Sequence, residues 1–533
     1  AHRLVALHGA DIVPVAVLGL HAGRSTQGHR FEASAPVIEI EDADSYVEQL
    51  RAKGAVIASF EARRSEIAHQ LSAAAATQKL TPVEDADLLD EVTALVERPN
   101  VLVCQFDAQF LEVPQECLIL TMKANQKYFP LLDATGKLTN KFLVVSNIRP
   151  ADPLPVITGN ERVVRPRLAD AKFFFDQDRK TRLADRVERL GKVLYHNKLG
   201  SLLARVQRIV KLAGVIAERL SADASQAQRA ALLCKADLLT DMVGEFPELQ
   251  GIMGRYYALH DGEAAAVADA IQQHYLPRFA SDTLPEHPTS QVVALADKLD
   301  TLIGIYGTGA IPTGDKDPFG LRRQALGVLR ILSECDLPLD LFELLKLAKA
   351  GFASGVVAET VDVDLQGFML ERLRGYLREH GYAVDEIEAV VGQDPARIDQ
   401  VVPRLKAVQA FRALPEADAL AGANKRIRNI LKKTTATKAH PEPLLFEAPA
   451  EKDLFTITSE LLPAVRALVN RESYSEALCM LAGARKSVDT FFDEVMVMTE
   501  DTRIRDNRLA LLTQVDALLN EVADISKLTA SAA

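Results

Sequence analysis

The chain has 533 residues, of which 48% are hydrophobic and 25% are charged, and its formal net charge is −11. This length exceeds what one hydrophobic core supports, so we expect about three or four domains. No segment approaches the roughly 18 apolar residues of a membrane helix, and no signal peptide precedes the first predicted strand, which predicts a cytoplasmic protein without a membrane span. The five cysteines form no C-x-x-C pair, which argues against a zinc knuckle or a disulfide framework.

The first 158 residues mix predicted strands with predicted helices. The chain starts at Ala1 and enters a strand-like segment, LVALHG, without an initiator Met, so we expect its natural start to be missing. A hairpin is predicted with its turn near Asp133–Lys137. Helical spacing occurs at Asp42–Lys53, Phe60–Leu80 and Glu84–Arg98. The pattern predicts an α+β domain over residues 1–158.

Long segments rich in Ala, Leu, Glu and Arg come next, and strand signals nearly vanish. Pro and Gly interrupt these segments, as expected where helices end. We therefore predict a mainly α, multidomain chain whose remaining domains are helical. Their predicted bounds are 159–335 for a central helical domain, 336–414 for a helical linker domain and 415–533 for a C-terminal helical bundle.

The segment Gly159–Lys180, GNERVVRPRLADAKFFFDQDRK, places three consecutive Phe residues among Arg and Lys. Pro166 suits the first turn of a helix, where its missing N–H costs nothing. The helical period then puts one apolar stripe on the core side, formed by Leu168, Ala171 and Phe175.

Two interpretations of this helix stay open. In the first, it packs between two domains while Arg165 and Arg167 are only solvated. In the second, these arginines also touch a phosphate backbone, because Arg supplies contacts that position RNA without reading its sequence. Both interpretations make the helix a hinge between domains.

Three segments between residues 196 and 300 resemble the metal-binding helices of the HD phosphohydrolase superfamily: HNKLGS, LLCKADLLTDM and ALADKLDTL. His196, Asp237 and Asp297 match the ligand positions of that superfamily, but Ala236 stands where its paired His belongs. Losing an imidazole should abolish or badly weaken the site, because ligand number and geometry govern metal binding. The resemblance implies an HD-like helical fold with no metal and no hydrolysis. A metal-dependent phosphohydrolase of the HD type is the competing hypothesis.

The segment 307–323, GTGAIPTGDKDPFGLRR, has the glycine spacing of a phosphate-binding loop. Asp315 stands where such a loop needs Lys, so we reject this interpretation. Asp317 as a cap and Pro318 in the first turn predict a helix start. Its buried face should hold Leu321, Ala325, Val328 and Leu332. Arg323 and Arg330 should share the opposite, exposed face, which is either solvated or contacts a phosphate or a partner.

The most basic segment is NKRIRNILKKTTATK at 424–438, which has six cations and no acid. Its buried face is predicted at Ile427, Ile430 and Leu431. Another face should hold Lys425, Arg428 and Lys432, with Asn429 beside them. A purely structural amphipathic helix normally interleaves Glu, so we predict that this face binds a polyanion rather than being only solvated. Further cations lie at Arg503, Arg505 and Arg508.

Four segments in the same order resemble the beta subunit family of bacterial glycyl-tRNA synthetases of the separate alpha/beta type. They are GNERVVRPRLADAKFFFDQDRK, KADLLTDMVGEFPELQGIMGRYYA, ADKLDTLIGIYGTGAIPTGDKDPFGLRRQALGVLRIL and VDTFFDEVMVM. The first domain, including TQGHRF at 26–31, is similar to the B domains of phenylalanyl-tRNA synthetase beta chains. The final helices, from about residue 415, resemble the anticodon-binding domain shared with arginyl-tRNA synthetases.

The resemblance implies a glycine–tRNA ligase subunit without catalytic residues of its own, which holds tRNA(Gly) while an alpha subunit performs ATP-dependent glycylation. It implies a tetramer of two alpha and two beta subunits, with ATP and Mg at the alpha subunit and no cofactor bound by this chain. The candidate RNA contacts are Lys425, Arg426, Arg428, Asn429, Lys432, Arg505 and Arg508, and also Arg165, Arg167 and Arg323. A scaffold that binds the alpha subunit but no RNA stays open as a third hypothesis.

Overall fold

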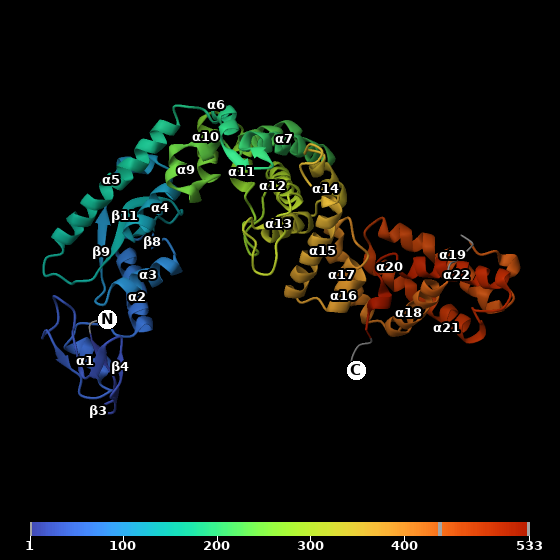
Figure 1. Ribbon diagram of the computed structural model, residues 1–533, viewed down its shortest axis with the longest axis horizontal. Coiled ribbons are helices and arrows are strands. Elements are labelled where there is room, and N and C mark those ends of the chain that lie inside the picture. The colour runs from blue at the N-terminus through green and yellow to red at the C-terminus, as the bar shows by residue number, and fades with distance from the viewer. Residues whose placement is uncertain (1–2, 435–439, 530–533) are drawn as a thin grey trace. The chain divides into compact units, whose positions relative to one another are not determined.

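The computed structural model describes residues 3–434 and 440–529 (Figure 1). The chain divides into two compact units. The first unit comprises residues 1–182 and 238–257, and the second comprises residues 183–237 and 258–533. Apart from one short hairpin, the described strands belong to the first unit, and the rest of the chain is helical. The predicted mainly α, multidomain fold is confirmed.

Short strands and one helix form the beginning of the first unit. They are β1 (Leu4–Val5), β2 (Leu7–His8), β3 (Asp11–Ile12), β4 (Ala16–Val17), β5 (Leu20–Gly23), β6 (Ser25–Thr26), β7 (Ile38–Glu39) and α1 (Tyr46–Ala52). Strand β5 lies between β1 and β4, parallel to the first and antiparallel to the second. Strands β2 and β3, and strands β6 and β7, form separate antiparallel pairs. A small core of Ile38, Ile40 and Leu50 supports these elements.

A four-stranded antiparallel sheet completes the predicted α+β domain. Its order is β8 (Thr81–Pro82), β10 (Phe129–Leu132), β11 (Leu138–Ser146) and β9 (Asn100–Gln105). The accompanying helices are α2 (Phe60–Thr77), α3 (Ala86–Leu95), the 3-10 turn η1 (Ala108–Glu112) and α4 (Gln115–Gln126). The side chains of Ser59 and Asp85 accept hydrogen bonds from backbone N–H groups at the starts of α2 and α3, respectively. These N–H groups would otherwise have no partner within the helix.

The predicted hairpin joins β10 to β11 and is confirmed. The Asp133 carboxylate fixes its turn by accepting hydrogen bonds from the backbone N–H groups of Thr135 and Lys137. Gly136 has a φ of 78°, which glycine adopts without the steric cost of a side chain. The apolar core of this part includes Ile67, Leu71, Val92, Phe129, Leu131 and Leu143.

Helix α5 (Leu154–Asp178) comes after the sheet and contains Pro166 in its interior. The prediction that the helix starts at Pro166 is wrong, because Pro153 and Pro155 already occupy its beginning. Pro166 removes one hydrogen bond of the helix, but a buried apolar stripe runs past it and compensates by packing. That stripe is Val164, Leu168, Ala171 and Phe175, of which the last three were predicted.

The predicted domain boundary at residue 158 therefore lies within α5, and the first unit extends beyond it. Asp178, at the end of α5, accepts hydrogen bonds from the backbone N–H groups of Asp241 and Met242 and from the Tyr257 hydroxyl. These bonds tie a later segment, residues 238–257, to α5. That segment contains α9 (Asp241–Glu245), the 3-10 turn η4 (Pro247–Leu249) and part of α10 (Ile252–His260).

Helix α12 (Pro288–Thr301) is the centre of the first helices of the second unit. It contacts α7 (Leu202–Arg219), α8 (Ala224–Leu233), α11 (Ala265–Gln273) and α13 (Leu321–Glu334). Its residues from Val292 to Thr301 are all buried. Around these helices lie α6 (Leu183–Arg186), η2 (Val187–Lys192), the hairpin of β12 (Leu194–His196) and β13 (Gly200–Ser201), η3 (Ala236–Leu239) and the π-helical turn η5 (Leu302–Tyr306).

Helix α13 begins slightly later than predicted, at Leu321, and Asp317 still caps it. The Asp317 carboxylate accepts hydrogen bonds from the backbone N–H groups of Leu321 and Arg322. Gly320, directly before the helix, has a φ of 65°. The predicted buried face is confirmed at Leu321, Ala325, Val328 and Leu332.

The predicted exposure of Arg330 on α13 is wrong. Its guanidinium is buried, with Nε 2.6 Å from Glu334 Oε1 and Nη1 donating to the Asp282 carbonyl. Arg323 is exposed, as predicted. One arginine of the pair thus stabilises the core, and the other faces solvent.

The second unit continues with α14 (Leu341–Lys349), α15 (Val361–Glu379), α16 (Val384–Val391), η6 (Ile398–Gln400) and α17 (Val401–Arg412). Its C-terminal bundle consists of α18 (Ala417–Lys433), η7 (Pro443–Leu445), α19 (Pro449–Val469), α20 (Tyr474–Leu481), η8 (Ala482–Ala484), α21 (Arg485–Glu494), α22 (Thr502–Leu519) and η9 (Ile525–Lys527). Helix α19 contacts α20, α21 and α22, and α18 contacts α22 and η9. Across the described part of the chain, no helix combines the length and apolarity needed to cross a bilayer.

Candidate nucleic-acid interface

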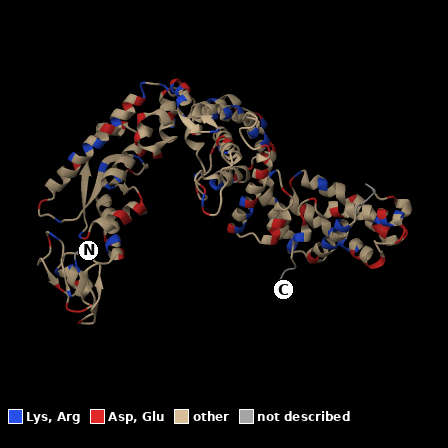
Figure 2. Ribbon diagram, viewed as in Figure 1, with Lys and Arg blue, Asp and Glu red and all other residues tan. Residues whose placement is uncertain are grey.

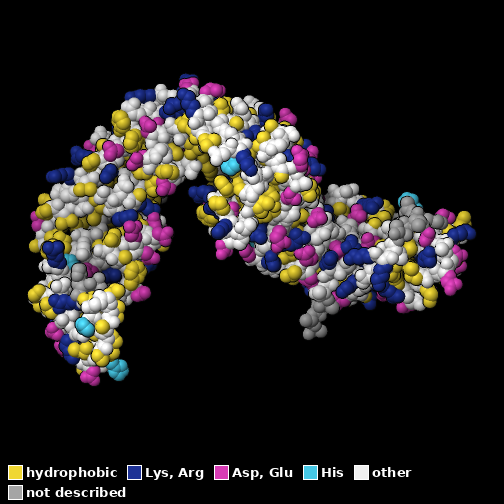
Figure 3. Space-filling model, viewed as in Figure 1, with side chains coloured by type: hydrophobic (Ala, Val, Ile, Leu, Met, Phe, Trp, Pro, Cys, Tyr) yellow, Lys and Arg dark blue, Asp and Glu magenta, His cyan; other side chains and the backbone are white. Residues whose placement is uncertain are grey.

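Helix α18 carries most of the predicted RNA contacts. Its inner side is anchored by Ile427, which is fully buried, and by Asn424, whose amide donates to the side-chain oxygen of Asn520 at the end of α22 (2.8 Å). Its exposed residues include Lys425, Arg426, Asn429 and Lys432. Figures 2 and 3 show Lys and Arg gathered along this helix. These four candidates therefore lie where a polyanion can reach them.

Arg428, predicted to share the open face, is held by acids of the bundle instead. Its Nε lies 3.1 Å from Asp516 Oδ1 on α22, and its Nη1 pairs with Asp524. The prediction that no acid neutralises this face is wrong for Arg428, because its acidic partners are distant in sequence and do not belong to the helix itself. Residues 435–438 of the same basic segment lie outside the described residues.

Arg426 is exposed and stacked on an aromatic ring. Its Cζ lies 4.2 Å from the centroid of Phe492 on α21. A guanidinium on an aromatic face keeps its N–H edge available for in-plane hydrogen bonds. The contact therefore orients a surface cation without neutralising its charge.

Arg508 on α22 is only 6% exposed and serves the interior of the bundle. Its Nε lies 2.8 Å from Glu451 Oε1, its Nη2 lies 3.0 Å from Glu447 Oε2, and its Nη1 donates to the Met496 carbonyl. The prediction that Arg508 contacts the anticodon arm is wrong, because burial and these partners occupy the guanidinium. Burial raises the pKa of Glu451, but the Arg508 hydrogen bond and two backbone N–H groups outweigh burial and hold that pKa below its ordinary value.

The remaining candidates lie on three different helices. Arg505 is half-buried on α22, Arg165 and Arg167 are exposed on α5, and Arg323 is exposed on α13. Arg165 also lines a cavity of about 340 Å³ together with Glu161 and Asn140. RNA contacts of these residues stay predictions.

The three residues that match HD ligand positions are not arranged as a ligand set. His196 stacks edge-on against Phe319, with ring centroids 6.3 Å apart, and Asp237 is buried in η3. Asp297 on α12 is engaged by two cations, since Arg205 Nη2 lies 2.8 Å and Lys235 Nζ 3.2 Å from its Oδ1. The described residues contain no group of three or more His, Cys, Asp or Glu side chains that could hold a metal ion. The donor set thus does not fit the metal of HD phosphohydrolases.

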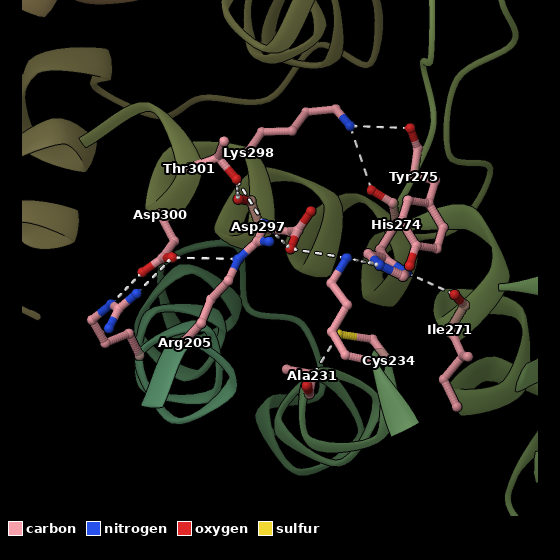
Figure 4. Close-up of polar contacts among 12 residues, drawn as sticks. Arg205, Ala231, Cys234, Ile271, His274, Tyr275, Asp297, Lys298, Asp300 and Thr301 are labelled. Atoms are coloured by element: carbon pink, nitrogen blue, oxygen red, sulfur yellow. Dashed lines mark hydrogen bonds and ion pairs between the residues drawn. The ribbon is translucent and has the colours of Figure 1, made fainter. Parts of the chain in front are cut away.

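The imidazole beside this carboxylate was not predicted. His274, at the end of α11, is fully buried (Figure 4). Its Nε2 lies 2.7 Å from Lys235 Nζ. The surrounding sequence, QQHYLP, carries no motif, so only the fold brings His274 toward α12. Lys235 was the one signal available from sequence, because it directly precedes Ala236 in the HD-like segment.

Burial and neighbouring charges set the protonation of these groups. Burial lowers the pKa of His274 well below its ordinary value, and Lys235 lowers it further, so the imidazole is neutral. Burial raises the pKa of Asp297, but Arg205 and Lys235 outweigh it and the pKa is lowered. Burial lowers the pKa of Lys298, the next residue on α12, to about 8. Its Nζ donates to the backbone carbonyls of His274 and Tyr275.

Known proteins are similar in sequence to this chain along nearly all of its length. A family model described as glycyl-tRNA synthetase beta subunit matches residues 1–392, and one described as DALR anticodon binding domain matches residues 420–531. Glycine–tRNA ligase beta subunits of Aromatoleum aromaticum and Thiobacillus denitrificans are 60% and 59% identical to it over 99% of this chain. The chain spans 76% of the length of each relative. It therefore belongs to the glycyl-tRNA synthetase beta subunit family, a family of aminoacyl-tRNA synthetases.

Proposed function

We propose that this chain binds tRNA(Gly) through its C-terminal bundle and positions it for glycylation at the active site of an alpha subunit. The observation that carries the proposal is the match of an anticodon-binding domain to residues 420–531, the region of helices α18 to α22. In that bundle, α18 exposes Lys425, Arg426 and Lys432. Such cations bind the phosphate backbone of RNA and release its counterions.

Two kinds of cation act together in the proposed interface. The exposed cations attract the RNA backbone, and Asn429 beside them offers both a donor and an acceptor to a base edge or a phosphate. Arg428 connects α18 to α22 through the half-buried Asp516. Arg508 connects α22 to α19 through the buried Glu451. A surface that is already ordered loses less conformational freedom on binding, so the inner pairs support the outer contacts.

The proposed partner is an alpha subunit that binds glycine, ATP and Mg, in a tetramer of two alpha and two beta subunits. The relatives from A. aromaticum and T. denitrificans are named beta subunits, which supports a partner subunit. In this proposal the present chain binds no cofactor and contributes no reacting group. It acts by orienting the 3′ end of the tRNA, and orientation can supply roughly several kcal/mol of a reaction barrier.

The proposal is tested by replacing Lys425 and Lys432 together by Ala and measuring tRNA(Gly) affinity of the alpha/beta assembly. We expect affinity to fall by about tenfold at low ionic strength, because each lost phosphate contact removes counterion release. Glycylation at limiting tRNA should fall in parallel. The matched control is Lys452→Ala, which removes an exposed lysine of α19 in the same bundle. Unchanged affinity in the double variant contradicts the proposal and favours a scaffold that binds only the alpha subunit.

A further inference from the structure

A single ammonium group connects three segments around α12. Lys235 lies between α8 and η3 and is 3% exposed. Its Nζ lies 2.7 Å from His274 Nε2, 3.2 Å from Asp297 Oδ1 and 4.1 Å from the centroid of the Tyr275 ring. Figure 4 shows the side chains of His274 and Asp297 directed toward the same point, where dashed lines mark these contacts. We call these three residues, Lys235, His274 and Asp297, the Lys235 cluster.

The orientation of the imidazole is set by its second nitrogen. His274 Nδ1 lies 2.6 Å from the Ile271 carbonyl oxygen, which can only accept a hydrogen bond. Nδ1 therefore carries the proton, and the lone pair of Nε2 points to the Lys235 ammonium. An imidazole lone pair and a carboxylate oxygen are the donor types that bind Zn²⁺ and similar ions, and a backbone carbonyl on the other ring nitrogen is the usual support of a metal-binding His.

We propose that Lys235 is a built-in cation that takes, between an imidazole and a carboxylate, the place that a divalent metal ion takes in metalloproteins. The ammonium supplies the positive charge and joins the end of α8, α11 and α12. Arg205 adds a second cation on Asp297 and stacks on Tyr195, with its Cζ 4.4 Å from the ring centroid. The site thus has two donors of the types found in metal centres, and the Lys235 side chain occupies the place between them. Lys235 is a positioning residue in this proposal.

Removal of the ammonium should leave both of its polar partners incomplete. In Lys235→Ala, His274 Nε2 loses its donor and Asp297 loses one of its two cations while keeping Arg205, both in a buried site. A buried acceptor without a partner and a carboxylate that has lost one cation destabilise the fold. The same vacancy offers an imidazole nitrogen and a carboxylate oxygen to a small cation from solution.

The experiment compares the thermal unfolding midpoint of the wild-type chain with that of Lys235→Ala. Each protein is measured alone, with Co²⁺, and with a large excess of methylammonium. The wild-type midpoint should not respond to either cation. The midpoint of Lys235→Ala should fall by about 5 °C or more and should rise again with each cation. Co²⁺ bound to nitrogen and oxygen ligands should also give a visible absorption band in the variant only. In Lys235→Ala/His274→Gln, which lacks the imidazole, the Co²⁺ band should disappear.

A second pair of variants tests the contact if Lys235→Ala does not fold. His274→Gln keeps a side-chain oxygen that can accept from the ammonium, whereas His274→Leu does not. We expect His274→Leu to lower the midpoint clearly more than His274→Gln. Equal midpoints of these two variants overturn the proposal. So does stoichiometric metal retained by the wild-type chain, or a Lys235→Ala variant that neither Co²⁺ nor methylammonium stabilises. None of these readouts involves tRNA, so they stand apart from the tRNA-binding proposal.

Discussion

The C-terminal bundle and the helical core around α12 use Arg and Lys in opposite ways. On α18, Lys425, Arg426 and Lys432 face solvent and keep their charge available. Around α12, Arg205 and Lys235 are turned inward onto Asp297. The difference shows that the role of a basic side chain is decided by which acids the fold brings to it, more than by the density of cations in the sequence.

The largest effect on stability is expected at Arg508, a cation of the C-terminal bundle that is buried against an acid, as Lys235 is around α12. Replacing Arg508 by Met should lower the free energy of unfolding by about 3–5 kcal/mol, because Glu451 is left buried without its partner. Urea unfolding monitored by helical circular dichroism measures this loss. Glu451→Gln in the same chain should recover part of it, since the unpaired charge is then absent. A loss below about 1 kcal/mol contradicts the assignment of Arg508 to the interior.

The next effect is a pH dependence that belongs to the core alone. In the folded chain the pKa of Lys298 is lowered to about 8. In the unfolded chain a Lys has its ordinary pKa of about 10.4. Between these values the unfolded chain binds more protons, so the free energy of unfolding should rise with pH from about 8 to about 10. The difference between wild type and Lys298→Met should change by about 1–3 kcal/mol over this window. Parallel curves for the two proteins rule out this titration.

A smaller effect is expected at Arg428, which is intermediate between the exposed cations of α18 and the cations buried against acids. It is half-buried and paired with Asp516 and Asp524, so Arg428→Ala should lower the free energy of unfolding by about 1–2 kcal/mol. The same measurement on Lys425→Ala should show less than about 0.5 kcal/mol, because that side chain is exposed. Similar losses in the two variants remove the distinction between inner and outer cations of α18.

Much of the fold could be predicted from local sequence patterns. The stripe of Leu168, Ala171 and Phe175, the hairpin turn at Asp133 and the buried face of α13 were all predicted from helical period and turn chemistry. The start of α5 was not, because a proline that is acceptable in a first turn is also tolerated within a helix whose packing compensates for the lost hydrogen bond.

The candidate site was harder to predict because its charges are paired across long stretches of sequence. Arg428 pairs with Asp516 and Asp524, and Arg508 pairs with Glu451, and each of these acids lies outside the helix of the arginine. The helical period places a cation on a face, but it does not say which distant acid lies opposite. His274 is similar, since no motif marks it and only the packing of α11 on α12 brings it to Lys235.

The most direct test of tRNA binding by α18 is the salt dependence of tRNA(Gly) binding by the alpha/beta assembly. For Lys425→Ala/Lys432→Ala, the slope of log K against log[salt] should become shallower by roughly 1 to 2, because one to two phosphate contacts are lost. The slope for Lys452→Ala should equal that of wild type. Identical slopes for all three proteins would contradict the claim that the exposed cations of α18 hold the RNA backbone.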